Sequence, residues 1–249
     1  MLNSVPSDRV ALVTGGSRGI GRAISQLLAA DGYKVCVNFR KDAGAAEETV
    51  AAIKGAGGTG WAVQADVSDE KQVQALFRNV KAEGGRLDVL INNAGRTHEG
   101  LLTLTSADCF LEVLKINLLG AYMCSQAAIR MMLPRRSGCI VNISSAAALR
   151  APLGLGAYAA AKAGLNTMTR SFAREVASRG IRINAVAPAY VVTDMLASAK
   201  GGGSGEIEKI PLGRFAQPQE IAAAVASIVR DEFSYLVGQV IVLDGGRGS

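Results

Sequence analysis

The sequence predicts an α/β protein with one doubly wound, seven-stranded parallel sheet flanked by helices on both faces. Three observations predict this fold. Seven short apolar runs alternate with helical patterns, the first turn is rich in glycine, and no repeat or linker divides the chain. Strands that alternate with helices pack as a parallel sheet covered on both faces. We therefore expect residues 1–249 to form a single domain.

The composition agrees with one globular domain. The chain has 249 residues, of which 49% are apolar and 19% are charged. A chain of this length buries roughly 70–75% of its extended-chain surface, so a large core is available. The net charge of +6 suits an acidic cofactor, an acidic carrier or a nucleic acid. Because the basic residues are scattered and aromatic residues are few, we do not expect a nucleic-acid partner.

Other classes of protein and site are excluded on similar grounds. No apolar run approaches the ~18 residues of a membrane span, and the polar residues 1–8 do not resemble a signal peptide. The only histidine, His98, lies in a predicted loop without a nucleophile elbow, so no Ser-His-Asp triad is expected. The four cysteines lack C-x-x-C spacing and are expected to be reduced thiols of a cytoplasmic protein, without zinc: Cys36, Cys109, Cys124 and Cys139.

The first strand–helix–strand unit predicts a dinucleotide site of the Rossmann type. A strand at 9–14 leads into a glycine-rich turn at 15–21, a helix and a second strand at 33–39. Glycines let backbone N–H groups approach a pyrophosphate at the helix N-terminus. A tight turn without a ligand is the alternative. The candidate contacts from this turn are Gly15, Ser17, Arg18, Gly19, Ile20 and Gly21.

The end of the second strand favours NADP(H) over NAD(H). A carboxylate at this place would accept hydrogen bonds from a free ribose 2′-hydroxyl. The sequence instead has Phe39-Arg40-Lys41, and Arg18 from the first turn reaches the same region. Cations beside the ribose suit a 2′-phosphate. The alternative is that Asp42 pairs with Arg40.

The next part of the chain continues the alternation. Helices are predicted at 43–54 and 70–83, and strands at 61–65 and 87–91. The 87–91 strand ends in Asn92-Asn93-Ala94-Gly95, at the sheet edge where open α/β sheets bind ligands. Two further helices are predicted at 107–118 and 119–133. Asn117 is unfavourable inside the first of them, so it is either a satisfied buried amide or the holder of a water.

A serine, a tyrosine and a lysine form the candidate catalytic group. The strand at 139–143 ends in Ser144-Ser145, and an Ala-rich helix at 157–178 carries Tyr158 and Lys162. Residues four apart share a helix face, so the ammonium should lower the phenol pKa from its usual value of about 10. Tyr158 then serves as general acid–base, and Ser145 holds a substrate carbonyl. Ser144 is the alternative to Ser145. A catalytic role for this group also requires that the rest of the chain binds a hydride donor.

The end of the chain completes the sheet. A strand at 181–187 ends at Pro188, and the last strand is predicted at 239–243 after a helix at 218–230. Residues 189–215 have low periodicity and include a glycine-rich stretch at 201–205. A segment of this length predicts a lid loop or a disordered segment.

Together these motifs resemble the short-chain dehydrogenase/reductase family over essentially the whole chain. Within the family, segments 158–165 and 173–180 are most similar to the 3-oxoacyl-[acyl-carrier-protein] reductases. The chain departs from the family in Pro188-Ala189, where Pro-Gly is usual, and in the 201–205 stretch. The matching motifs are 14–21, Asp66-Val67, 92–95, Asn117, Ser145, Tyr158-x-x-x-Lys162, and Pro188 with Thr193.

The resemblance implies roles for particular residues. The implied catalytic residues are Asn117, Ser145, Tyr158 and Lys162, with Asn117 anchoring a water and Lys162 holding the nicotinamide ribose. Two basic positions of these reductases that dock the acidic carrier fall on Arg136 and Arg179, where ordinary surface arginines are the alternative. The implied NADP(H) contacts, beyond those of the first turn, are Arg40, Asp66, Val67, Asn93, Ala94, Gly95, Tyr158, Lys162, Pro188, Val191 and Thr193.

The expected activity is NADPH-dependent reduction of a 3-oxoacyl thioester, bound to acyl carrier protein or to coenzyme A. A reductase or dehydrogenase of another ketone, alcohol or sugar is the second interpretation, and a dinucleotide-binding scaffold without turnover is the third. The resemblance implies a homotetramer with a place in fatty acid biosynthesis; polyketide, polyene and polyester pathways remain open.

Overall fold

The described residues form a seven-stranded parallel sheet in the order β3-β2-β1-β4-β5-β6-β7, as the sequence predicts. The structure is a computed structural model, and it describes residues 8–197 and 205–248. Every pair of neighbouring strands is parallel. The strands are β1 (Val10–Val13), β2 (Lys34–Phe39), β3 (Thr59–Gln64), β4 (Val89–Asn92), β5 (Gly138–Ile143), β6 (Ile181–Pro188) and β7 (Val240–Leu243).

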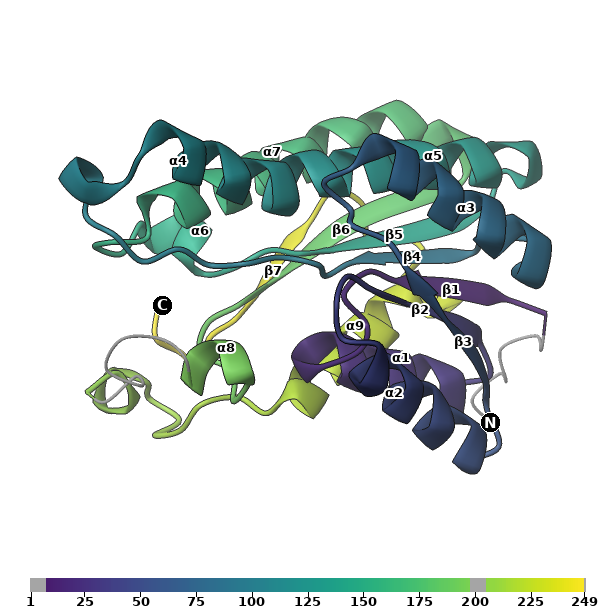
Figure 1. Ribbon diagram of the computed structural model, residues 1–249, viewed down its shortest axis with the longest axis horizontal. Coiled ribbons are helices and arrows are strands. Elements are labelled where there is room, and N and C mark those ends of the chain that lie inside the picture. The colour runs from purple at the N-terminus through teal and green to yellow at the C-terminus, as the bar shows by residue number, and fades with distance from the viewer. Residues whose placement is uncertain (1–7, 198–204, 249) are drawn as a thin grey trace.

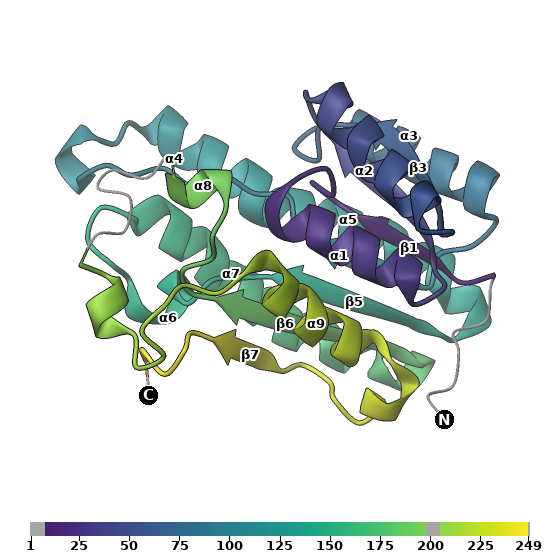
Figure 2. The same cartoon turned by 90° about the horizontal axis from the view of Figure 1, so that it is seen from below.

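Helices cover both faces of this sheet, as Figure 1 shows. One layer holds α1 (Gly19–Ala30), α2 (Ala43–Gly55) and α9 (Pro218–Val229), and Figure 2 shows these three from below. The other layer holds α3 (Glu70–Gly84), α4 (Ala107–Leu114), α5 (Gly120–Met132) and α7 (Gly156–Val176). Two short helices, α6 (Ala147–Arg150) and α8 (Asp194–Ala197), follow β5 and β6. The predicted doubly wound architecture is therefore confirmed.

Strand β1 illustrates how the apolar runs build two cores at once. Its alternate side chains, Val10 and Leu12, enter the core beneath α3 and α5, while Ala11 and Val13 enter the core beneath α1 and α9. All four side chains are fully buried. A strand with helices on both faces has no solvent side, which explains why these strands read as continuous apolar runs.

The helix boundaries follow from capping side chains. Asp42 accepts a hydrogen bond from the Ala45 N–H (3.0 Å) at the start of α2. Asp69 accepts from the backbone N–H groups at the start of α3, and Pro218 occupies the first turn of α9. A capping carboxylate satisfies N–H groups that have no partner within the helix. These caps place all three helices within one or two residues of their predicted limits.

The α4–α5 region differs from the prediction of two helices at 107–118 and 119–133. Helix α4 ends at Leu114, a π-helical turn spans Lys115–Leu119, and α5 begins at Gly120. Backbone angles stay helical across both joints, so the segment is one continuous rod. Single π turns within helices occur often at functional sites. The turn contains Asn117, whose side chain is discussed below.

The predicted lid at 189–215 contains more structure than its sequence suggested. Helix α8 lies within it, and a 3₁₀ turn follows at Ile207–Lys209. The Val191–Ala216 bridge ties its two ends together. Residues 198–204, with most of the glycine-rich stretch, lie outside the described residues. Among the residues that are described, no helix has the length and apolar character needed to cross a bilayer.

Candidate active site and dinucleotide cleft

The glycine-rich turn after β1 is joined to the turn after β4 by hydrogen bonds. The Thr14 hydroxyl accepts from the N–H groups of Asn93 (3.0 Å) and Ala94 (3.1 Å). The Asn93 side-chain amide donates to the carbonyls of Thr14 and Gly15, both at 3.0 Å. Strand order reverses between β1 and β4, and ligands of open α/β sheets bind at such a switch point. Sequence and structure therefore place the cleft at the same point.

Two glycines are required by the close approach of this turn to α1. Gly15 has φ +60°, a conformation that other residues rarely adopt. A Cβ on Gly21 would lie 2.2 Å from the Gly15 carbonyl oxygen and 2.6 Å from the Asn93 amide nitrogen. Since no side chain caps α1 at Arg18, its first N–H groups face the cleft without a side-chain acceptor. A helix N-terminus in this state binds anions such as phosphate.

Three residues that sequence reasoning missed hold this turn in place. Buried Asn38 accepts from the Gly15 N–H (3.3 Å) and donates to the carbonyls of Val63 and Ala65. The Ser17 carbonyl accepts from the Arg22 guanidinium (2.9 Å) and the Thr49 hydroxyl (3.0 Å). Asn38 could have been found from the sequence, because it is a polar residue inside the apolar 33–39 run. A buried amide needs hydrogen-bond partners, so its position indicates that it bonds to neighbouring segments.

The cleft beside this turn has a volume of about 660 Å³. A second cavity of about 250 Å³ adjoins it, and the two share Ile20, Asn93, Gly95, Thr97 and Thr193 in their lining. A long ligand can therefore extend from one cavity into the other. The predicted cofactor contacts that line the larger cleft are Gly15, Ser17, Arg18, Gly19, Ile20, Gly21, Arg40, Asp66, Val67, Asn93, Ala94, Gly95 and Thr193.

Three cations gather at the β2 end of the cleft. Arg18, Arg40 and Lys41 are exposed and line it. Arg40 pairs at 3.7 Å with Asp66, which also accepts from Ser68, and not with Asp42 as the alternative interpretation held. The pairing with Asp42 fails because that carboxylate caps α2. The 3.7 Å ion pair leaves the Arg40 guanidinium at the cleft, where it suits a phosphate group.

The smaller cavity brings together the predicted catalytic residues. It is lined by Asn117 from the π turn, Ser145 after β5, and Tyr158 and Lys162 on α7. The predicted cofactor contacts Pro188 and Val191 line it from the end of β6. Sequence reasoning missed Arg150, Tyr190 and Arg247 as lining residues. These contacts join segments that are far apart in the chain, so no local pattern could have revealed them.

The pKa values of the tyrosine and the lysine are set mainly by burial. Burial raises the pKa of Tyr158 above its usual value, and the hydrogen bond with Ser145 opposes that rise. Burial lowers the pKa of Lys162 to about 8. The net shift of the Tyr158 pKa is therefore opposite to the lowering that the sequence predicted, because burial has the largest influence. The ammonium donates to the Ile143 carbonyl (2.7 Å) and lies 5.7 Å from the tyrosine ring centroid.

Asn117 has one half of its amide satisfied and the other half without a partner. Its nitrogen donates to the carbonyls of Arg96 (2.8 Å) and Val113 (3.0 Å). Its buried oxygen has no hydrogen-bond partner in the described part of the chain. A Cβ on Gly95 would lie 2.6 Å from this oxygen and 3.6 Å from the Lys162 ammonium, so Gly95 leaves both groups accessible to each other. A water held between them would satisfy the oxygen.

The two arginines predicted to dock a carrier lie at the other edge of the sheet. Arg136 lies two residues before β5 and Arg179 two residues before β6, whereas Ser145 and Tyr158 come after the carboxyl end of β5. The Arg136 guanidinium donates to the Ser178 carbonyl (2.7 Å), so the two turns touch. Both arginines are exposed. The structure brings them together but does not bring them to the cavity.

Comparison with known proteins shows that the chain is similar to reductases over nearly its whole length. The family model described as enoyl-(acyl carrier protein) reductase matches residues 15–247. The 3-oxoacyl-[acyl-carrier-protein] reductase FabG of Staphylococcus aureus (strain Mu50) is 43% identical over 237 residues, covering 95% of this chain and 96% of that protein. The corresponding reductases of Synechocystis sp. and Salmonella typhimurium (strain LT2) are 41% and 40% identical, each over 96% of both chains.

Proposed function

The chain belongs to the short-chain dehydrogenase/reductase family, and from this premise we propose that it reduces a 3-oxoacyl thioester to the 3-hydroxyacyl thioester with NADPH. The observation that carries the proposal is the joining of two cavities. One has a phosphate-binding turn, and the other has a tyrosine, a serine and a lysine in contact with the same space. A carbonyl placed between them meets a hydride donor and a proton donor together.

The substrate class is supported by the named relatives, all of which are 3-oxoacyl-[acyl-carrier-protein] reductases that align over nearly the whole chain. The acyl group is carried on acyl carrier protein or on coenzyme A. The same catalytic residues also serve for another ketone, alcohol or sugar, which is the competing substrate class. Fatty acid biosynthesis is the pathway that the proposed substrate suits.

The choice of NADPH is supported by charge at the β2 end of the cleft. Arg18, Arg40 and Lys41 line the place where the ribose 2′-position of a dinucleotide is expected. A 2′-phosphate carries negative charge and takes hydrogen bonds from guanidinium groups. The nearby carboxylate of Asp66 is engaged by Arg40 and Ser68. When bound, NADPH supplies the hydride for the carbonyl carbon.

In the proposed mechanism, Tyr158 donates a proton to the carbonyl oxygen as negative charge develops there. Its raised pKa keeps the phenol protonated at neutral pH, which is the state required for reduction. Ser145, whose hydroxyl lies beside that of Tyr158, donates its single O–H to the same carbonyl oxygen once the substrate is bound. Donors fixed in advance at a developing charge stabilise the transition state.

Lys162 and Asn117 return the proton to Tyr158. With a pKa of about 8, the Lys162 ammonium exchanges protons readily near neutral pH. The partnerless oxygen of Asn117 holds a water beside it and so links the site to solvent. Lys162 also binds the ribose hydroxyls of the nicotinamide half. Both roles follow the family resemblance and fit the geometry around Gly95.

We also propose that the protein is a cytoplasmic homotetramer. The α4–α5 rod exposes Phe110, Leu111, Leu119 and Tyr122 by between 38% and 50%, and apolar side chains grouped on one rod suit an interface between copies. Cys36, Cys124 and Cys139 are buried thiols, as expected for a reducing compartment.

A substrate panel with NADPH tests the proposed function. Acetoacetyl thioesters on coenzyme A and on acyl carrier protein would be compared with small ketones and sugars. The proposal predicts a kcat/KM for the thioesters at least about tenfold above that of any other carbonyl, a difference of about 1.4 kcal/mol. A preference for a sugar or simple ketone would favour the competing class. No NADPH oxidation with any carbonyl would support a scaffold.

Carrier docking at Arg136 and Arg179 has its own test. Arg136→Glu and Arg179→Glu should raise KM for the carrier-bound thioester and leave KM for the coenzyme A thioester unchanged. Both positions are exposed and far from the cavity, so the fold should tolerate the changes. Equal effects on both substrates would contradict docking.

A further inference from the structure

The C-terminal segment Asp244–Gly248 lies against the substrate cavity. Arg247 lines the cavity directly, together with Arg150 of α6 and Tyr190 after β6. Asp244 pairs with Arg150 at 2.7 Å, which attaches the segment to the α6 side of the cavity. In Figure 1 the chain ends beside α6 after leaving β7. A segment that follows the last strand of the sheet therefore forms part of the active-site wall.

Arg247, Tyr190 and Glu206 form a closed set of contacts. The Arg247 guanidinium pairs with the Glu206 carboxylate and lies 4.9 Å from the centroid of the Tyr190 ring. The Tyr190 side chain also lies close enough to Glu206 to help lower the pKa of that carboxyl. The ring also stacks on Phe215, with centroids 5.4 Å apart and planes at 28°. The Tyr190 ring is thus contacted by both Arg247 and Phe215.

The C-terminal segment is itself fixed before and after Arg247. The Asp244 carboxylate accepts from the N–H groups of Gly246 (3.0 Å) and Gly248 (2.8 Å). The Gly245 carbonyl accepts from the Leu212 N–H (3.2 Å). Arg247 is only 17% exposed at its side chain, and Glu206 is 23% exposed. A partly buried, anchored guanidinium is better suited to positioning a ring than a free surface arginine is.

The size of the cavity makes the position of Tyr190 important. The cavity volume of about 250 Å³ lies below the 300–1,000 Å³ that is typical of ligand pockets. The ring of Tyr190 is among the largest side chains in its wall. If the ring moved, the cavity would widen by much of the volume of that ring.

We propose that Arg247 is a positioning residue that holds Tyr190 against the substrate cavity, and that the C-terminal segment thereby limits the length of acyl group the site accepts. The inference rests on the proposed function, since the acyl group is the part of a 3-oxoacyl thioester that varies in length. Arg247 contributes through the contact of its guanidinium carbon with the ring, 4.9 Å from the ring centroid. A lysine at this position keeps a positive charge beside the Glu206 carboxylate. It lacks the guanidinium that contacts the Tyr190 ring.

The test compares kcat/KM for 3-oxodecanoyl and acetoacetyl coenzyme A, with NADPH saturating. In Arg247→Ala, kcat/KM for the long substrate divided by kcat/KM for the short one should rise about tenfold. This is the smallest effect expected when an apolar pocket changes by the size of one methylene group. The rise should appear mainly as a lower KM for the long substrate, in enzyme that still reduces acetoacetyl coenzyme A. Arg247→Lys should give an intermediate ratio.

A double-mutant cycle shows whether Arg247 acts through Tyr190. Tyr190→Ala should raise the same ratio at least as much, and adding Arg247→Ala should then change nothing, because residues in contact are not additive. The matched control is Lys209→Ala. Lys209 also pairs with Glu206 (2.8 Å), but it is 61% exposed and does not line the cavity, so its loss should leave the ratio unchanged.

Each outcome supports or overturns the inference. An unchanged ratio in Arg247→Ala and Arg247→Lys, in enzyme that still reduces acetoacetyl coenzyme A, overturns it. Additive effects of the Tyr190 and Arg247 changes, or an equal rise in Lys209→Ala, also overturn it. If the wild-type chain reduces neither thioester, the proposed function fails instead. Should Arg247→Ala not fold, the Arg247→Lys ratio decides.

Discussion

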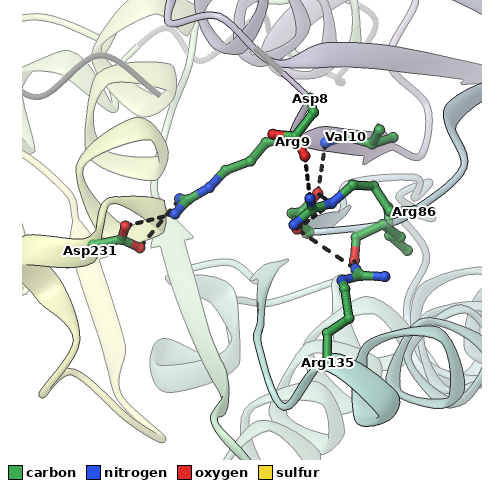
Figure 3. A network of polar contacts seen from close by, with 8 residues as sticks. Asp8, Arg9, Val10, Arg86, Arg135 and Asp231 are labelled. Carbon is green, nitrogen blue, oxygen red and sulfur yellow. Dashed lines mark hydrogen bonds and ion pairs between the residues drawn. The ribbon is translucent and has the colours of Figure 1, made fainter. Parts of the chain in front are cut away.

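The two edges of the sheet differ in the surroundings of their buried charged groups, Asp88 at the amino edge and Lys162 at the carboxyl edge. At the amino edge, charges are paired with each other, as Figure 3 shows. Buried Asp88 accepts from the Val10 N–H (2.9 Å) and from Arg86 (2.7 Å), and it also pairs with Arg135 at 3.7 Å. Asp8 binds the same Arg86. The Arg9–Asp231 pair joins the start of β1 to the turn after α9.

At the carboxyl edge, polar groups are buried without such partners. Among the described residues, no carboxylate lies within ion-pair distance of the Lys162 ammonium, which binds only the Ile143 carbonyl. The Asn117 oxygen accepts no hydrogen bond. Leaving buried polar groups unpaired costs stability, which is reasonable only where a ligand or water completes them. The comparison teaches that the charge of Asp88 is balanced within the fold, whereas Lys162 and Asn117 in the cavity keep hydrogen-bonding capacity that a ligand or water can take up.

The largest expected effect is on turnover at the carboxyl edge. Tyr158→Phe should lower kcat by about 10³-fold, because it removes the general acid that reduction requires. The affinity for NADPH, measured by fluorescence titration, should change less than about twofold, since the contacts to phosphate come from the turn after β1. Tyr235→Phe, a fully exposed tyrosine, is the control and should behave as wild type. Near-normal turnover in Tyr158→Phe would show that another group supplies the proton.

The largest effect at the amino edge should be on stability. Asp88→Asn leaves Arg86 and Arg135 without their shared carboxylate, and breaking a buried pair in this way costs about 3–5 kcal/mol of unfolding free energy. Urea unfolding measures the loss. The folded fraction should keep its kcat, because none of these residues lines the cavities. A drop in kcat without a loss of stability would contradict the claim that Asp88 stabilises the fold and takes no part in turnover.

A smaller stability effect should follow the titration of Lys162. Burial lowers the pKa of Lys162 from 10.5 to about 8, so between these pH values the unfolded chain binds more protons than the folded chain. The free energy of unfolding should therefore rise with pH across this window, by about 3 kcal/mol relative to Lys162→Met. Chemical unfolding of both proteins at pH 7.5, 9 and 10.5 measures the difference. Parallel pH curves for the two proteins would mean that the lysine is not destabilised by burial.

The smallest of these effects concerns cofactor choice. Arg40→Asp should weaken NADPH binding by about tenfold to a hundredfold, as expected for losing a hydrogen bond to a charged group, and should affect NADH little. Lys71→Asp, the same charge change on the exposed first turn of α3, is the control. The measurement is KM for each cofactor. Equal weakening of NADPH and NADH would contradict a 2′-phosphate beside Arg40.

Much of the fold was predictable because the local signals agree. Each strand is a short apolar run that is bounded by turn residues, and caps such as Asp42 and Asp69 lie at the helix starts. The predicted catalytic and cofactor residues also line the two cavities, and most of them follow strands whose carboxyl ends must meet at one edge. Arg136 and Arg179 precede their strands and so lie at the opposite edge, which the sequence analysis did not consider.

The remainder depended on contacts between distant segments. The π turn around Asn117 has the same apolar period as the helices beside it, so the sequence showed only a helix. The pairing of Arg40 with Asp66 and the Arg247–Glu206–Tyr190 set join residues that only the folded chain brings together. The direction of the Tyr158 pKa required knowing how deeply the pocket buries the phenol.

Hydrogen–deuterium exchange with and without NADPH tests the contrast between the two edges most directly. We predict slower exchange on NADPH addition at the carboxyl edge, in 15–21, 93–95 and 188–193, because ligand binding stabilises the groups it contacts. Exchange at the amino edge, in 86–88, 133–137 and 230–233, should not change. Protection confined to the amino edge, or absent from the turn after β1, would contradict the account.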